Sequence, residues 1–333
     1  MEKQDLIINK FGSRIRKTRE RFQIFHPITK FHKEYPAKDI TKIVILRPCS
    51  ISSGAIELAI ENDVDIVYLG KFGKPYARVY PSKLGGPVLI RKKQGEASHS
   101  YTATVLAKEF INGKCQNQIN YLKHLSQNTD KDFSLNIHKA EAILDSLQFI
   151  KGDIKNIRNQ LFGVEGYAAD KYFTSLAQLI SFPGRQPKSK DPFNIMLNYG
   201  YGILYSEIER ACLMIGLDPY TGFYHTERYG KPSLILDLIE EFRVPLVDSA
   251  IVPLFYEHKV EKTDLETKGN ILQLSKSGKS KVINRVFQRF HQEVIFGKKK
   301  RKLINIIALQ AKNLSNFLIG KREKYCAFTF VDF

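Results

Sequence analysis

The sequence predicts a multidomain α+β protein, with a small β-rich amino-terminal domain followed by a larger all-helical carboxyl-terminal domain. The chain has 333 residues, of which 43% are hydrophobic, enough for two cores, with one large domain as the alternative. Up to about residue 90, the apolar runs are short, β-branched and bounded by glycine and proline, which is typical of strands. From about residue 100, apolar residues recur every three or four positions, which is typical of helices.

The amino-terminal domain, residues 1–90, is expected to contain mainly strands and one helix. The expected strands cover residues 6–8, 22–25, 43–46, 65–70 and 76–80. The helix is expected over residues 52–60, with Ser52 as its N-cap. Because no catalytic constellation is found in this domain, we expect it to pack against itself in a dimer or against the second domain.

A segment rich in proline, glycine and basic residues follows the last of these strands. We interpret residues of about 85–100 as the interdomain linker, so that the carboxyl-terminal domain spans 101–333. Solvent exposure explains the charge of this linker most simply, and contact with phosphate is the alternative.

The carboxyl-terminal domain is expected to be helical throughout. Helices are expected at residues 104–121, 138–151, from about 153, 191–216, 282–296 and 303–319. Asp191 and Pro192 fit the start of the fourth of these helices, and Gly216 fits its C-cap. The basic run 298–302 is expected to be a loop joining the last two helices, exposed to solvent or in contact with phosphate.

Residues 217–248 combine a loop carrying His225 with a helix expected to begin near an N-cap at Ser233 and to end at Pro245. Three acids of this helix, three or four residues apart, are expected to share one face: Asp237, Glu240 and Glu241. Carboxylates on one face after a loop histidine suit a hard metal ion. An acidic face exposed to solvent is the alternative.

Glu165 lies between Gly163 and Gly166 in a helical pattern. Glycines on both sides would let neighbouring backbone approach closely and expose the carboxylate. A glycine within a helix costs about 1 kcal/mol relative to alanine, so a packing or functional reason is expected.

The formal net charge is +18, which favours a polyanionic partner such as nucleic acid over a basic protein without one. No run of about 18 apolar residues indicates a membrane helix. The first residues lack a signal-peptide pattern, so we expect a cytoplasmic protein with no membrane association.

The four cysteines are far apart, so neither a zinc pair nor a redox Cys-x-x-Cys is present. Motifs for nucleotide hydrolysis, serine catalysis, zinc proteases and EF-hands are absent.

Several ordered motifs together resemble the CRISPR-associated spacer integrase family, which also acts as an endonuclease. The motifs lie at residues 51–55, 65–69, 107–114, 163–169, 191–201, 216–225 and 232–243. The resemblance runs nearly end to end and implies an amino-terminal dimerisation domain and a helical catalytic domain. It also implies a homodimer that works with a small ferredoxin-like adaptation partner on spacer DNA and the CRISPR repeat.

The same resemblance implies a site for Mn²⁺ or Mg²⁺ whose ligands are Glu165, His225 and Glu240. Asp237 is the accompanying acid, expected to orient the nucleophile or move a proton, and Glu241 competes for the third ligand position. A DNA 3′-hydroxyl would attack a phosphodiester, which is transesterification, and water in its place would give hydrolysis.

Five basic residues near the motifs are candidates to hold the DNA backbone: Arg158, Lys171, Arg228, Lys231 and Arg243. Two positions depart from the family, because Asp170 and Lys231 stand where arginine is common. The first reverses a charge and the second loses a bidentate fork. The alternative functions are a stand-alone metal-dependent nuclease acting on branched DNA or RNA, and a non-catalytic DNA-binding scaffold.

Overall fold

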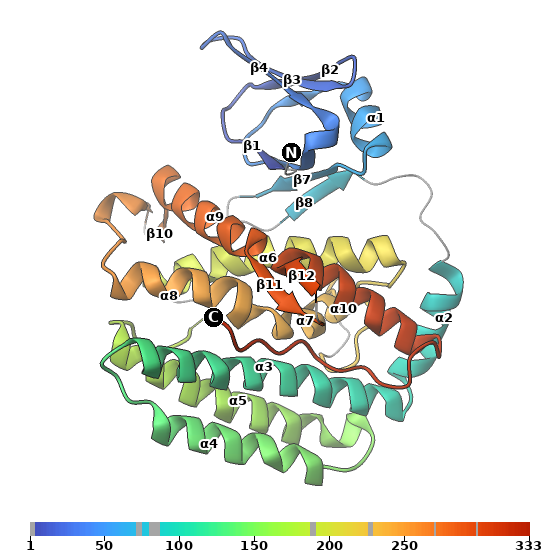
Figure 1. The fold of residues 1–333 in the computed structure, drawn as a ribbon, viewed down its shortest axis with the longest axis vertical. Coiled ribbons are helices and arrows are strands. Elements are labelled where there is room, and N and C mark those ends of the chain that lie inside the picture. The colour runs from blue at the N-terminus through green and yellow to red at the C-terminus, as the bar shows by residue number, and fades with distance from the viewer. Residues whose placement is uncertain are drawn as a thin grey trace. The chain divides into compact units, whose positions relative to one another are not determined.

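The computed structural model describes residues 4–70, 75–79, 87–186, 191–225, 229–269, 271–297 and 299–333. The chain forms two compact units, Met1–Lys83 and Leu84–Phe333. The first is a small unit of sheets and the second is mainly helical, so the predicted α+β class is correct at this level (Figure 1).

Two four-stranded sheets make up the first unit. One has the order β1-β5-β7-β8, in which β1 and β7 run parallel to β5, and β8 is antiparallel to β7. The other has the order β4-β3-β2-β6, with β6 parallel to β2. The bounds are β1 (Gln4–Ile8), β2 (Arg14–Thr18), β3 (Arg21–His26), β4 (Phe31–Pro36), β5 (Ile40–Ile45), β6 (Ser50–Ile51), β7 (Asp65–Leu69) and β8 (Pro75–Val79).

The core of this unit is mainly aliphatic, and one helix packs against it. Ile15, Phe22 and Ile43 are buried together with Leu58 of α1 (Ser53–Glu61). The predicted N-cap is confirmed, because the side chain of Ser52 accepts a hydrogen bond from the N–H of Ala55.

Residues 87–98, placed in the expected linker, instead form the helix α2 (Pro87–Ser98). Its polar sequence gives little helical periodicity, so the pattern pointed to a loop. Tertiary contacts stabilise it: the buried Gln94 side chain donates to the carbonyls of Asp218 (2.8 Å) and Thr221 (2.7 Å) and accepts from the N–H of Asp218 (2.8 Å). The helix therefore holds the start of the histidine loop.

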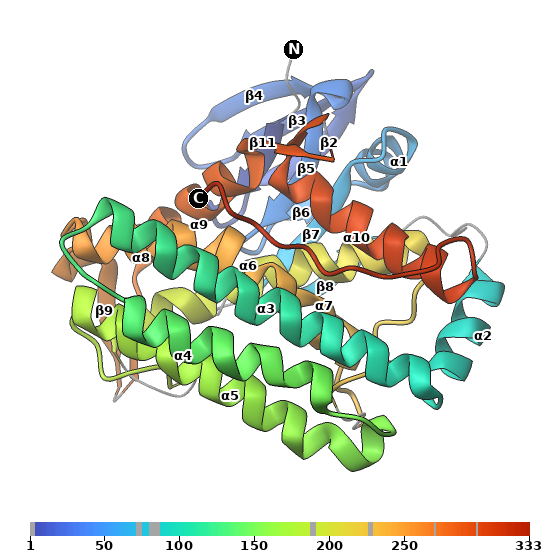
Figure 2. The same ribbon diagram turned by 60° about the horizontal axis from the view of Figure 1, so that its bottom comes forward.

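The helices α3 (Tyr101–Asn128), α4 (Ser134–Asp145) and α5 (Ile154–Leu179) pack against one another (Figures 1 and 2). The next helix, α6 (Pro192–Ile215), has the predicted ends. The Asp191 side chain accepts from the N–H of Asn194, and Gly216 is left-handed with φ 91°. Short 3-10 turns occur at η1 (Ala37–Asp39), η2 (Ser146–Phe149) and η5 (Lys262–Asp264).

The helix predicted from Ser233 to Pro245 begins where expected, but its predicted N-cap and its predicted end are wrong. Pro232 is the N-cap and Ser233 is the first residue of α7 (Ser233–Leu238). The chain then tightens into a 3-10 turn, η3 (Ile239–Glu241), and widens into a π-helical turn, η4 (Val244–Asp248), before α8 (Ser249–Tyr256). Pro245 does not end the segment, because it stands in the first turn of η4, where its missing N–H costs little.

The expectation of an all-helical second unit is wrong, because two antiparallel hairpins occur in it. They are β9 (Leu265–Lys268) with β10 (Ile271–Leu274), and β11 (Glu293–Phe296) with β12 (Lys299–Lys302). The helix predicted to reach 296 is α9 (Lys276–His291), and α10 (Leu303–Leu318) follows the second hairpin. Glu293 pairs in register with Lys302, so the basic run is largely a strand rather than a loop.

Among the helices of the described residues, none is long and apolar enough to cross a membrane.

Candidate active site

The loop that carries His225 is arranged by the buried carboxylate of Asp237. This carboxylate accepts hydrogen bonds from the backbone N–H groups of Phe223 (2.6 Å), Tyr224 (3.0 Å) and His225 (2.8 Å). It also lies 2.7 Å from Nδ1 of His225. Because an ionised carboxylate only accepts, this contact selects the tautomer of the neutral imidazole in which Nδ1 carries the proton and Nε2 has the lone pair.

Gly222 makes this arrangement sterically feasible. A Cβ at this position would lie 2.6 Å from Cβ of Ser233 and 3.0 Å from Oδ2 of Asp237. The loop therefore approaches α7 more closely than any other residue would permit. By contrast, a Cβ at Gly163 or Gly166 would meet nothing within 4 Å, so the close backbone approach expected beside Glu165 is not their role.

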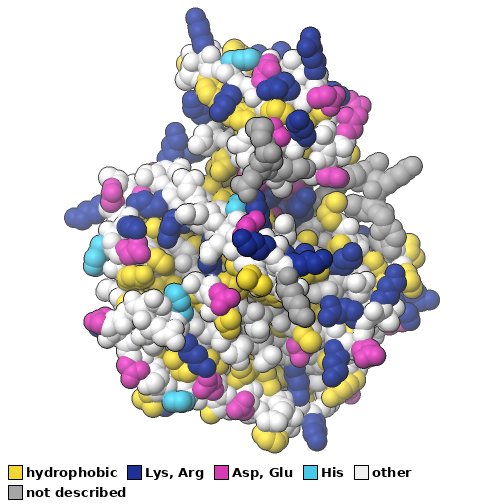
Figure 3. Space-filling model, viewed as in Figure 1, with side chains coloured by type: hydrophobic (Ala, Val, Ile, Leu, Met, Phe, Trp, Pro, Cys, Tyr) yellow, Lys and Arg dark blue, Asp and Glu magenta, His cyan; other side chains and the backbone are white. Residues whose placement is uncertain are grey.

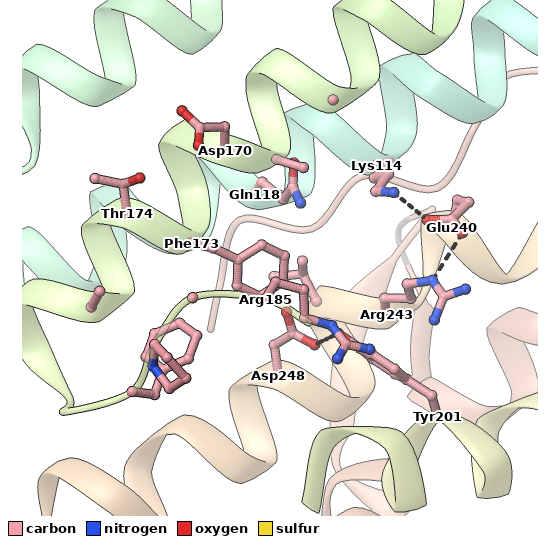
Figure 4. Close-up of a pocket in the computed structure, with 17 residues that line it drawn as sticks. Lys114, Gln118, Asp170, Phe173, Thr174, Arg185, Tyr201, Glu240, Arg243 and Asp248 are labelled. Atoms are coloured by element: carbon pink, nitrogen blue, oxygen red, sulfur yellow. Dashed lines mark hydrogen bonds and ion pairs between the residues drawn. The ribbon is translucent and has the colours of Figure 1, made fainter. Parts of the chain in front are cut away.

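An ammonium group joins the two carboxylates predicted as ligands. Nζ of Lys114, on α3, contacts Oε1 of Glu165, on α5, and lies 2.8 Å from Oε2 of Glu240, on η3. The hydroxyl of Tyr224 donates to the other oxygen of Glu165, and Nε of Arg243 lies 2.9 Å from Oε1 of Glu240. Figure 4 shows Lys114 and Arg243 meeting Glu240 from two sides.

The charges of this cluster stabilise one another. Burial disfavours ionisation of Glu240, but the charges of Arg243 and Lys114 outweigh it and hold the pKa of that carboxyl below its usual value. Burial likewise opposes the charge on Lys114, and the carboxylates of Glu240 and Glu165 reverse the effect and raise the pKa of Lys114. The cluster is therefore ionic despite being buried.

The donors in this cluster fit a hard divalent cation. One oxygen of Glu165 and one of Glu240 already converge on the ammonium group of Lys114. Oε2 of Glu240 is buried and makes this ion pair but no hydrogen bond. The contact of Nδ1 of His225 with Asp237 is the support that a ligating histidine needs. Within the described ranges, no three such side chains yet converge at ligand distance.

Glu241 faces away from this cluster, although it adjoins Glu240. Its buried carboxylate accepts from Nε2 of Gln310 (3.0 Å), the hydroxyl of Tyr325 and the N–H of Phe328 (2.7 Å). In a 3-10 turn, residues three apart are eclipsed and the next residue is rotated by about 120°. Asp237, Glu240 and Glu241 therefore do not share one face as expected. Burial raises the pKa of Glu241 to about 7.

A cavity of about 660 Å³ adjoins the cluster. Lys114, Glu240 and Arg243 form part of its wall, and the guanidinium groups of Arg185 and Arg243 lie 5.5 Å and 4.6 Å from the ring centre of Tyr201. Asp248 also lines it and accepts from the hydroxyls of Tyr172 (2.9 Å) and Tyr201 (2.6 Å). Burial raises the pKa of Asp248 to about 6.

The predicted basic residues do not gather in one place. Arg243 belongs to the cluster itself, whereas Lys171 lies 2.9 Å from the carboxylate of Asp170 and 4.8 Å from the ring centre of Tyr167. Arg158 and Lys231 are partly exposed. Arg228 lies outside the described residues.

The sequence interpretation assigned no role to Lys114, Tyr224 or Gln94. Lys114 does stand in a motif that carried the resemblance, and its place three residues before the buried Asn117 on α3 was a usable signal. Nothing in the local sequence pairs Gln94 with the histidine loop, because its partners are more than a hundred residues away.

The family model described as CRISPR associated protein Cas1 matches residues 6–288. The chain is 31% identical over 305 residues to a CRISPR-associated endonuclease Cas1 of Archaeoglobus fulgidus, covering 86% of this chain and 88% of that one. It is 32% identical to a Cas1 protein of Methanobrevibacter ruminantium over 88% of this chain and 89% of the relative.

Solved structures agree with this similarity. A casposase bound to integration product is 27% identical and has a TM-score of 0.82, with 100% of this chain and 94% of that chain covered. A Cas1 protein from Thermotoga maritima has the same fold, with a TM-score of 0.78 at 17% identity over 98% of this chain and 100% of its own.

Proposed function

The chain belongs to the CRISPR-associated Cas1 family, and from that premise we propose that it is a metal-dependent DNA integrase and endonuclease of CRISPR adaptation. One arrangement carries the proposal. Glu165 and Glu240 converge on the ammonium group of Lys114, and Asp237 orients His225 through its Nδ1. The site would join 3′-hydroxyl ends of spacer DNA to the repeat array.

We propose that Glu165, Glu240 and Nε2 of His225 hold the metal, Mn²⁺ or Mg²⁺. The bound ion would polarise the phosphodiester and stabilise charge on its oxygens. Glu240 is preferred to Glu241 because the carboxylate of Glu241 is occupied by Gln310, Tyr325 and Phe328.

For Asp237 we propose a positioning role rather than proton transfer. Its two oxygens already accept three backbone N–H groups and the Nδ1–H of His225, and the side chain is fully buried. It therefore fixes the tautomer and the direction of His225. Arg243, which pairs with Glu240 at the cavity wall, is placed to assist a phosphate there.

DNA is the proposed partner, supported by the casposase bound to integration product and by the net charge of +18. One chain of a solved Cas6-RT-Cas1–Cas2 complex contains the fold of this chain over 36% of its length, with a TM-score of 0.76 at 17% identity. We propose a homodimer formed through the first unit and a small ferredoxin-like adaptation partner, as expected from the sequence.

The test of the ligand set uses Glu165→Ala and His225→Ala. Glu141→Ala is the control, because Glu141, on α4, pairs with Lys123, on α3, outside the site. We expect both site variants to lose metal-dependent strand transfer and to keep duplex binding. Full strand transfer in either one would contradict the assignment.

A stand-alone nuclease is the second candidate, favoured because several relatives are named as CRISPR-associated endonucleases. The protein, its small partner, a short duplex with free 3′ ends and a repeat-containing plasmid would be incubated together. Joined product supports integration, and cleavage of branched DNA or RNA without joining supports the nuclease.

A further inference from the structure

We infer that Lys114 is the resident counter-cation of the acidic cluster and that a divalent metal binds by displacing its ammonium group. The inference rests on the proposed metal site and adds to it a competition between this side chain and the metal. Lys114 would then set the affinity for the metal without being a metal ligand.

The first step is the identity of the oxygens. Each carboxylate has one oxygen held by a neighbour, since Tyr224 donates to Oε2 of Glu165 and Arg243 pairs with Oε1 of Glu240. The oxygens that remain are Oε1 of Glu165 and Oε2 of Glu240, and both contact Nζ of Lys114. These are the two oxygens that a metal bridging the carboxylates needs.

The second step is electrostatic. The Glu165 and Glu240 side chains are only 14% and 5% exposed, so their negative charges would repel strongly without a cation between them. Lys114, itself 14% exposed, supplies that cation in the metal-free protein. A divalent ion held by the same two oxygens would take the place of the ammonium group, because both cations need the same oxygens.

The third step is the path of the displaced group. Lys114 and Glu240 both line the cavity of about 660 Å³, so the flexible lysine chain has room to turn away while α3 stays in place. Arg243, which also lines the cavity, keeps its contact with the outer oxygen of Glu240.

The test is a Mn²⁺ titration of the full-length protein without DNA, followed by calorimetry and by the electron paramagnetic resonance signal of free Mn²⁺. Lys114→Met keeps the length of the side chain and removes the competing charge. We expect it to bind Mn²⁺ about tenfold more tightly than the wild type and to lose thermal stability in the absence of metal. A lysine that only braces the fold would leave the affinity unchanged, so equal or weaker binding overturns the inference.

Lys114→Arg is the second variant and retains the charge. Its fork can hold both carboxylates more firmly, so we expect Mn²⁺ binding about threefold or more weaker than in the wild type. If Lys114→Met does not fold without metal, this variant decides the question, and wild-type or tighter affinity in it overturns the inference.

Glu165→Ala separates this inference from the proposed function. If the wild type binds Mn²⁺ and Glu165→Ala does not, the metal site stands, and unchanged affinity in the Lys114 variants then overturns the displacement alone. If the wild type binds no Mn²⁺, both fall.

Discussion

Asp237 concentrates more hydrogen bonds than any neighbouring acid of the site. Four donors meet its two oxygens: three backbone N–H groups and Nδ1 of His225. An ionised carboxylate can accept all four, whereas an amide has only one accepting atom. The residue thereby turns a flexible loop into a fixed support for the imidazole.

Asp237→Asn is therefore expected to be far from conservative. Its amide nitrogen would face N–H donors in a buried place, which costs about 2–3 kcal/mol or more of the free energy of unfolding. We also expect Mn²⁺ affinity to fall, because the His225 tautomer is no longer fixed. Urea unfolding and Mn²⁺ titration measure the two effects, with the 83% exposed Asp130, changed to Asn, as the control. Wild-type stability in Asp237→Asn would contradict this account.

Asp248 gives a prediction about pH. Burial raises its pKa to about 6 from an ordinary value near 3.8, so the folded protein favours the protonated carboxyl. The resulting stabilisation is present below pH 3.8 and is lost as pH rises through about 6, and the difference corresponds to about 3 kcal/mol.

Asp248→Asn cannot lose a proton, so its stability relative to the wild type should rise between about pH 4 and pH 6. Urea unfolding of both proteins across that range measures the difference. Other titrating groups, including Glu241, are present in both proteins and cancel in the comparison. Parallel stability curves would show that Asp248 ionises normally in the folded chain.

At the scale of elements, residues 325–330 of the carboxyl-terminal segment, here called the strap, run along α3 and are hydrogen-bonded to it (Figures 1 and 2). Asn117 donates to the carbonyls of Glu241 (2.8 Å) and Phe328 (2.9 Å) and accepts from the N–H of Phe330 (2.7 Å). One amide therefore joins α3 to both η3 and the strap. Gly113 makes room for it, because a Cβ there would lie 2.6 Å from Cβ of Ala327.

Asn117→Ala should release the strap. Three buried hydrogen bonds are lost, so we expect the free energy of unfolding to fall by about 2–4 kcal/mol and the amides of residues 325–330 to exchange faster. Asn120→Ala is the matched control, because it removes one bond to this segment, to the carbonyl of Phe330 (2.9 Å), and one bond within α3, from Gln116 (2.9 Å). Equal losses in the two variants would argue against the junction.

The strap and the second hairpin also show what sequence patterns miss. Long amphipathic helices such as α6 could be predicted with their ends, because a cap, a periodic face and a terminal glycine are all local signals. β11 and β12 have four residues each, too few for a period of two to stand out from the helix before them. Glu241 resembled a ligand in the sequence, because its hydrogen-bond partners Tyr325 and Phe328 are distant in the chain and only the fold brings them to its carboxylate.

For the whole molecule, the division into a strand-rich part and a mainly helical part was readable, since it needs only the dominant period of each region. The candidate ligands came from motifs, and Lys114 also stands in one, but its ion pairs with Glu165 and Glu240 could not be predicted, because an ion pair between distant segments leaves no trace in spacing. Local patterns therefore identify which residues carry chemistry, whereas their charge balance requires the fold.

The net charge of +18 is a property of the entire surface. Figure 3 shows lysine and arginine side chains spread over the visible face rather than confined to one patch. Such a surface should bind duplex DNA of unrelated sequence through phosphates, so the logarithm of the binding constant should fall linearly with the logarithm of salt concentration. Fluorescence anisotropy from about 50 to 200 mM salt measures the slope, and a flat line would contradict phosphate binding.

Replacing one basic residue by a neutral one should change the salt slope by an amount that depends on whether the residue is already paired with a carboxylate. Among the described residues, no carboxylate pairs with Arg158 or Lys231, so each is free to meet a phosphate. We expect Arg158→Gln and Lys231→Gln each to reduce the slope by about 0.9. Lys171→Gln is the matched control, since Lys171 already lies 2.9 Å from the carboxylate of Asp170 and should change the slope less. A larger change at Lys171 would mean that DNA breaks this ion pair, and that the acid at position 170 opposes binding as its place in the family motif suggests.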